Sequence, residues 1–191
     1  MMRLFIAITP SGEQREELGR LQQRLGSTLE GVKWVAPPSL HLTLKFLGEL
    51  EESRRTAITA AMRGCARGAA PFALRFGGAG VFPSMRRARV IWTAVKEGAG
   101  EVSALAAALE AELVKRGFPA ESRPFRAHLT LGRIRQPLPA GVLERLLKEE
   151  SPFSTGVTVV RSLSLYRSHL SPRGASYSAL EEIYLADNRG K

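Results

Sequence analysis

The sequence contains one tetrapeptide twice, and the two copies carry two of its three histidines. HLTL begins at His41 and returns unchanged at His128. Two imidazoles, with ordinary pKa values near ~6.5, suit a reaction in which one proton is removed and another is delivered at neutral pH. Phosphodiester opening is such a reaction, because a base activates water while an acid protonates the departing ribose oxygen. We predict His41 and His128 as the catalytic pair, with the hydroxyls of Thr43 and Thr130 bonded to the phosphate oxygens.

Each copy of the tetrapeptide lies in a predicted strand, over residues 41–47 and 127–134. Side chains alternate along a strand, so histidine and threonine share one face while the two leucines occupy the other. A single copy is most simply explained as a half-buried strand with a structurally bonded histidine. Strand periodicity does not explain why both outward positions repeat the same pair, and we therefore expect two polar faces that line one cleft.

A metal site is the rival interpretation, since histidine is a common ligand. Neither copy has an Asp, Glu or Cys at adjacent ligand spacing, and the sequence has no HExxH motif. Cys65 is the only cysteine, which excludes an intramolecular disulfide and leaves too few thiolates for a zinc or iron–sulfur site. We expect neither a metal nor a cofactor.

The charge balance favours anionic partners. Lysine and arginine number 28 against 18 acidic residues, giving a formal net charge of +10 and a pI near 10.6. A basic surface also serves solubility, so charge alone does not decide the partner. The apolar run at residues 4–8 is too short for a signal peptide or for the ~20 residues that span a bilayer. We expect a cytoplasmic monomer with no membrane contact and no obligate protein partner.

The order of predicted elements favours an α+β fold with antiparallel sheets, because strand-to-strand steps without an intervening helix recur. No Gly, Ser or Pro-rich linker divides the chain, so we expect one domain over residues 1–191. The glycine-rich stretch 77–80 lacks the pattern of a nucleotide-binding P-loop and is interpreted as a turn. The patterns predict strands at 4–8, 32–35, 41–47, 72–76, 89–95, 127–134, 157–166 and 176–185, and helices at 13–29, 51–67, 100–116 and 141–150.

Further segments surround the repeat in a recognisable order: RLFIA at 3–7, VKWV at 32–35, KFLG at 45–48, VFPS at 81–84, RVIW at 89–92, RPFRA at 123–127, GR at 132–133, LYRS at 165–168 and GASY at 174–177. With these segments the chain resembles the two-histidine phosphoesterase superfamily over nearly its full length. Within that superfamily it is most similar to the RNA 2′,3′-cyclic phosphodiesterases, also called 2′-5′ RNA ligases. Ala127 is one departure, since relatives often carry proline there.

The resemblance implies a bilobed fold. Each lobe is an antiparallel sheet with helices on its outer face, and a pseudo-twofold axis relates the lobes, which need not be contiguous in sequence. The strands that carry the repeat are expected to meet in a central groove.

The resemblance also implies hydrolysis of a terminal 2′,3′-cyclic phosphate, on RNA ends or on nucleosides, to a 2′-phosphate. In that reaction His41 is the expected acid on the leaving 3′ oxygen and His128 the expected base on water. Arg133 matches a family arginine that clamps the phosphate. Simple alternation places Arg133 opposite His128, so this role requires a bulge; the alternative is a solvated arginine at the strand end.

Two other functions stay open at this point. One is ligation of tRNA-like halves through a 2′-5′ bond, and the other is a module that binds RNA ends without turnover. Phe46, Trp34 and Phe82 are candidates for stacking on a base, but core packing is the preferred interpretation because they lie in apolar runs. His169, the third histidine, is expected to be exposed and incidental.

Overall fold

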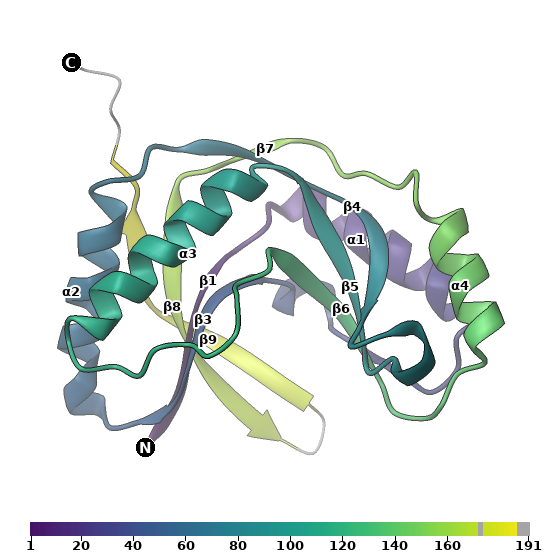
Figure 1. Cartoon of the computed structure of the whole chain (residues 1–191), viewed down its shortest axis with the longest axis horizontal. Helices are drawn as coiled ribbons and strands as arrows, with labels where there is room; N and C mark the ends of the chain where they lie inside the picture. Colours follow the sequence, from purple (N-terminus) through teal and green to yellow (C-terminus); the bar gives the residue numbers. More distant parts are fainter. Residues whose placement is uncertain (172–173, 187–191) are drawn as a thin grey trace.

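The computed structural model describes residues 1–171 and 174–186 and has two antiparallel sheets with helices on their outer faces (Figure 1). The predicted α+β class is confirmed. No helix in these ranges is both long and apolar enough to cross a membrane. In chain order the strands and α-helices are β1 (Met2–Ile8), α1 (Gly12–Gly26), β2 (Val32–Trp34), β3 (Leu42–Leu50), α2 (Arg55–Ala66), β4 (Phe72–Phe82), β5 (Val90–Glu97), α3 (Ala99–Val114), β6 (His128–Ile134), α4 (Ala140–Glu149), β7 (Thr158–Val160), β8 (Ser162–Ser171) and β9 (Gly174–Tyr184).

The two sheets form two lobes, and each lobe takes strands from distant parts of the chain. One sheet has the order β3-β1-β8-β9, and α2 and α3 pack against it. The other has the order β2-β6-β5-β4-β7, with α1 and α4 against it. In Figure 1 the α2/α3 pair and the α1/α4 pair lie on opposite sides of the molecule. Helix α1 follows a strand of the first sheet but packs on the second, which links the lobes.

The strand predicted over residues 157–166 is wrong in one respect, because the structure divides it between the two sheets. Strand β7 pairs with β4 in the second sheet, and β8 pairs with β1 in the first. Arg161 lies between them at the crossing point, where its carbonyl accepts from Leu185 N at 2.8 Å. Alternating side chains look the same on either sheet, so periodicity cannot locate such a crossing.

The turn predicted at residues 77–80 is also wrong, since these glycines lie inside β4. The pairing of β4 with β5 shifts between Gly77 and Gly80, and Gly78 has a φ of +62°, so the segment is a glycine bulge. A Cβ atom at Gly80 would lie 2.5 Å from the ring of Trp92. Glycine is therefore required here by close packing, and the chain reverses later, after Phe82.

Helix α1 begins at a capping box and buries one leucine face. The Ser11 hydroxyl accepts from the backbone N–H of Gln14 at 3.1 Å, and the Gln14 side chain accepts from Ser11 N at 3.4 Å. Leu18, Leu21 and Leu25 recur at three and four residues and are fully buried. The cap and the apolar stripe together fix where the helix starts and which way it faces.

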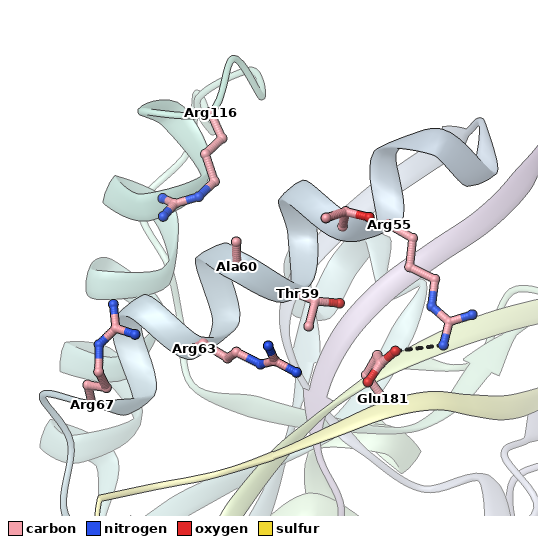
Figure 2. A pocket seen from close by; sticks show the side chains of 8 residues that line it. Arg55, Thr59, Ala60, Arg63, Arg67, Arg116 and Glu181 are labelled. Atoms are coloured by element: carbon pink, nitrogen blue, oxygen red, sulfur yellow. Dashed lines mark hydrogen bonds and ion pairs between the residues drawn. The ribbon is translucent and has the colours of Figure 1, made fainter.

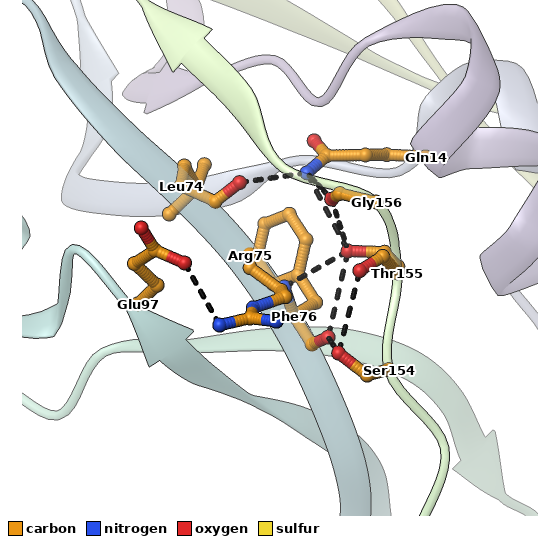
Figure 3. A network of polar contacts seen from close by, with 8 residues as sticks. All are labelled: Gln14, Leu74, Arg75, Phe76, Glu97, Ser154, Thr155 and Gly156. Atoms are coloured by element: carbon orange, nitrogen blue, oxygen red, sulfur yellow. Dashed lines mark hydrogen bonds and ion pairs between the residues drawn. The ribbon is translucent and has the colours of Figure 1, made fainter.

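The same Gln14 side chain joins α1 to the second sheet (Figure 3). Its amide Nε2 donates to Leu74 O at 2.9 Å and to Gly156 O at 3.0 Å, and the residue is 1% exposed. Beside it, the hydroxyl of Thr155 accepts from Phe76 N at 3.0 Å. Three segments distant in sequence thus share one buried polar network.

We predict that Gln14→Leu lowers the free energy of unfolding by about 2–4 kcal/mol, because the buried carbonyl of Leu74 and the partly buried carbonyl of Gly156 lose their donor. Gln23→Leu, on the exposed face of the same helix, is the matched control and should change stability by less than ~0.5 kcal/mol. Denaturant unfolding measures both. Equal stabilities for the two variants would contradict the structural role of Gln14.

Candidate active site

The two HLTL copies lie on strands from different sheets that meet at the centre of the molecule. Strands β3 and β6 approach with Cα atoms within 8 Å of each other. Leu42, Leu129 and Leu131 are fully buried and Leu44 is 6% exposed, whereas the histidines and threonines are partly exposed. The predicted alternation is confirmed. We call His41, Thr43, His128 and Thr130 together the HLTL junction.

Both histidine rings are held by the same backbone contact. The Nδ1 atom of His41 lies 2.8 Å from the carbonyl oxygen of Ser39, and Nδ1 of His128 lies 2.7 Å from that of Arg126. A carbonyl oxygen can only accept, so Nδ1 carries the hydrogen in each ring. The neutral tautomer therefore leaves the Nε2 lone pair free on both rings, as proton transfer requires.

Aromatic rings enclose His41. Its ring centroid lies 4.6 Å from that of Phe5 and 5.0 Å from that of Tyr177, which meets it edge-on. Burial lowers the pKa of His41 because it disfavours the charged imidazolium, and the hydrogen bond to Ser39 opposes this effect in part. In the free protein His41 is thus held toward its neutral form.

His128 has a similar aromatic wall from the other sheet. The ring of Phe82 meets it edge-on at 5.0 Å, and Trp92 lies at 6.3 Å. Phe82 and Trp92 stack on each other at 4.9 Å and are half-buried, and neither belongs to the hydrophobic core, so Phe82 lies beside His128 rather than in the core position expected for it. Trp34 is likewise half-buried, against the core.

A bulge in β6 turns Arg133 toward the junction. The pairing of β5 with β6 shifts by one residue between Ile91 and Trp92, so Leu131 has no partner on β5. Because of this extra residue, Arg133 is exposed and returns to the face that carries His128. The bulge expected before Arg133 is confirmed.

The first copy has the same bulge one residue after its threonine. The β1–β3 pairing shifts between Ile6 and Ala7, which leaves Leu44 unpaired. The position matching Arg133 in this copy is Phe46, which is 62% exposed. The preference for core packing of Phe46 is therefore wrong, because the bulge turns it outward.

Arg133 influences Tyr177, the side chain that contacts His41, through its charge. The Tyr177 ring contacts His41, and burial raises the pKa of its hydroxyl. The positive charge of Arg133 opposes that rise, since a nearby cation favours the phenolate. The charge of Arg133 on the second sheet thus acts on a side chain of the first sheet that contacts His41.

The comparisons with known proteins match this geometry. The sequence model for "LigT like Phosphoesterase" matches residues 8–92 and again residues 93–177, so each match contains one HLTL copy and one bulge. The chain belongs to the LigT-like phosphoesterase family. The family expected from the sequence is thereby confirmed, as is the internal repeat.

Three similar proteins are each named RNA 2′,3′-cyclic phosphodiesterase. The RNA 2′,3′-cyclic phosphodiesterase of Methanothermobacter thermautotrophicus is 38% identical over 96% of this chain and 99% of that protein. The protein of Aquifex aeolicus is 31% identical over 97% of this chain and 98% of its own length. The protein of Thermus thermophilus is 35% identical over 100% of this chain and 93% of its own length.

Solved structures agree with the fold. The crystal structure of TT0787 of Thermus thermophilus has a TM-score of 0.83 at 32% identity, covering 98% of this chain and 100% of that one. The crystal structure of E. coli LigT complexed with 3′-AMP has a TM-score of 0.75 at 27% identity, and the match covers 97% of this chain and 99% of the LigT chain.

The sequence only partly anticipated the surroundings of the LigT-like site. A cavity of about 90 Å³ lies beside His41 and does not include His128. Tyr177, in the GASY segment, and Phe5, in the strand predicted at residues 4–8, both contact His41, and periodicity gives no signal for either contact. His169 is exposed as expected, with its Nε2 2.9 Å from Ser178 Oγ. The cavity is lined by Phe5, Thr9, Arg15, Pro38, Ser39, Leu40, His41, Tyr166 and Tyr177.

No metal-ligand cluster is found in the part of the chain that the structure describes. Across residues 1–171 and 174–186, His, Cys, Asp and Glu side chains do not gather in groups of three or more. The available donors at the junction are imidazoles, hydroxyls and one guanidinium, which can move protons and bind an anion.

We predict that long-range ¹H–¹⁵N NMR finds the hydrogen on Nδ1 of both His41 and His128 when the rings are neutral, because each Nδ1 faces a carbonyl. The midpoint of the His41 titration should lie below the ordinary ~6.5, since burial destabilises its charged form. Added inorganic phosphate should move that midpoint upward, because an anion favours the imidazolium. A predominant Nε2–H tautomer on either ring would contradict the backbone contacts.

Proposed function

We propose that this chain, as one domain, is an RNA 2′,3′-cyclic phosphodiesterase that yields a 2′-phosphate by metal-independent acid–base catalysis. The observation that carries the proposal is the pair of imidazoles, each fixed through Nδ1 to a carbonyl and followed by a threonine on the same face. The names of the similar proteins support the same activity and substrate. RNA ends and nucleoside 2′,3′-cyclic phosphates are the proposed substrates.

In the proposed reaction, one Nε2 accepts a proton from water as the water oxygen attacks phosphorus. The bond between phosphorus and the 3′ oxygen breaks, and the other imidazolium donates its proton to that oxygen. The 2′ oxygen keeps the phosphate, and the enzyme finishes with the two protonation states exchanged. Water is the only co-substrate, and the reaction involves no change of oxidation state.

We assign the acid role to His41 and the base role to His128. Burial lowers the pKa of His41 in the free protein, so an acid there depends on the bound phosphate to favour the imidazolium. The rate should therefore have a bell-shaped pH profile, with one imidazole neutral and one protonated. The upper limb should move to higher pH in kcat than in kcat/KM, because only kcat reports the substrate complex.

Thr43, Thr130 and Arg133 are the proposed phosphate ligands. The threonines share a face with the histidines, and the bulge at Leu131 places Arg133 on the same face. Hydroxyl and guanidinium donors aimed at non-bridging oxygens stabilise the charge that develops in the transition state. The structural likeness to E. coli LigT complexed with 3′-AMP supports a nucleotide phosphate as ligand.

We predict that His41→Ala and His128→Ala each lower kcat on a nucleoside 2′,3′-cyclic phosphate by ~10²–10⁴-fold, since each removes one proton transfer. The assay contains excess chelator and identifies the product phosphate by its position. His169→Ala, which removes the exposed histidine, is the control and should retain full activity. The mechanism would be contradicted if the chelator abolished activity, or if the His41→Ala and His128→Ala variants both remained active. A joined strand resistant to 3′-5′-specific nucleases would instead indicate ligation.

We predict that Thr43→Val and Thr130→Val each lower kcat by ~10²-fold, as expected for loss of one transition-state donor. Thr→Ser at the same positions keeps the hydroxyl and should restore most of the rate. Arg133→Gln should lower kcat/KM by about tenfold or more, because a charge-assisted contact is lost. If Arg133→Gln behaves like wild type, Arg133 is a solvated strand-end residue.

A further inference from the structure

A second polar site lies between α2, the end of α3 and β9 (Figure 2). It is a cavity of about 450 Å³, large enough for a small ligand, and it shares no lining residue with the cavity beside His41. We call it the arginine pocket. Its lining consists of Arg55, Thr56, Thr59, Ala60, Arg63, Arg67, Arg116 and Glu181.

Two of its four arginines are already paired. Arg55 donates to Glu181 at 2.6 Å and to the carbonyl of Leu180 at 2.9 Å. Arg116 donates to the Glu112 carboxylate at 2.6 Å, outside the lining itself. These ion pairs hold the rim and leave the lining with four guanidinium groups against one carboxylate.

The other two arginines are free to bind a ligand. Within residues 1–171 and 174–186, the side chains of Arg63 and Arg67 form no ion pair and donate no hydrogen bond. They stand one turn apart at the end of α2, and both are exposed. Figure 2 shows the Arg63 guanidinium directed toward Thr59 and Glu181, and that of Arg67 on the side of Arg116.

Thr59 is the second, independent indication of a ligand. The residue is 9% exposed, and its Oγ1 is buried with no hydrogen-bond partner among the described residues. A buried hydroxyl without a hydrogen-bond partner is unfavourable, so a polar group that enters the pocket and bonds to Thr59 Oγ1 is favoured. Its position beside Arg63 suits an oxygen that also accepts from a guanidinium (Figure 2).

The lining selects phosphate rather than a base. Guanidinium groups match the oxygens of a phosphate through paired hydrogen bonds. None of the described lining residues is aromatic, so nothing in the pocket can stack on a nucleobase. Contacts of this kind position a nucleic acid without reading its sequence.

Strand β9 connects the arginine pocket to the HLTL junction. Tyr177, which contacts His41, and Glu181, which pairs with Arg55, are four residues apart on this strand, or about 13 Å at the rise of a β-strand. The pairing of β8 with β9 shifts at Leu180, a bulge that separates the faces of the two side chains. Because β9 is an edge strand, an RNA strand can pass from one face to the other around it.

We propose that the arginine pocket binds a backbone phosphate of the RNA whose cyclic end occupies the HLTL junction, on the 5′ side of that end. The proposal rests on the proposed function for its choice of RNA, and on Arg63, Arg67 and Thr59 for its choice of phosphate. The pocket then adds affinity for long substrates and none for mononucleotides.

The test is Arg63→Ala/Arg67→Ala in the full chain, against Arg145→Ala/Lys148→Ala as a control that removes two exposed cations from α4. For an oligoribonucleotide with a 2′,3′-cyclic end, the pocket variant should raise KM about tenfold with kcat unchanged. Hydrolysis of a nucleoside 2′,3′-cyclic phosphate should be unaffected. Loss of the contacts to this one phosphate should also reduce the slope of log affinity against log salt by about 0.7. An oligonucleotide KM no higher than that of the control overturns the proposal.

A binding assay with 3′-hydroxyl RNA needs no turnover and separates this proposal from the proposed function. One outcome is that the pocket variant binds this RNA more weakly than the control while neither the wild type nor the variant hydrolyses a cyclic phosphate. That result supports RNA binding by the arginine pocket and overturns the proposed catalytic activity. Inorganic tripolyphosphate is the second probe. If it binds the wild type and not the pocket variant, but RNA binding is equal in both, the ligand is a free phosphate compound and the RNA assignment is overturned.

Discussion

Two imidazoles must be presented on strands whose opposite faces are buried in the core, and the rest of the structure follows from that requirement. The leucines of each HLTL copy anchor the strand, so the histidine is forced outward. A carbonyl two residues earlier then fixes each ring through Nδ1. A ring held in this way keeps one tautomer and one direction, which a freely rotating surface histidine does not.

The same bulge occurs in both HLTL strands, but the residue that it turns outward differs between the two copies. An extra residue at Leu44 and at Leu131 reverses the alternation in both strands. The next outward position is Phe46 in one copy and Arg133 in the other. The two halves therefore share a backbone bulge but differ in chemistry, because the first presents an exposed aromatic ring five residues after its histidine and the second presents a cation at the same position.

The lobes are joined by more than the junction between β3 and β6. Helix α1 leaves the first sheet and packs on the second, and the chain returns between β7 and β8. Buried glutamines of α1 bond to carbonyls of the second lobe, Gln14 at Leu74 and Gln22 at Leu131, the bulged residue itself, at 2.8 Å. These contacts cost free energy if broken, so they resist sliding of one sheet over the other.

Local patterns alone predicted most helices and strands and the outward histidines and threonines, because these follow from periodicity and from one repeated motif. The bulge before Arg133 was expected only from the family resemblance, since periodicity alone places Arg133 on the opposite face. The sequence did not determine that residues 77–80 continue a strand, that a strand changes sheets at Arg161, or that Phe46 is exposed. Those outcomes depend on which strand pairs with which, and pairing is decided by contacts between residues distant in sequence. The arginine pocket is of the same kind, since only the packing of α2 against α3 and β9 brings its charges together.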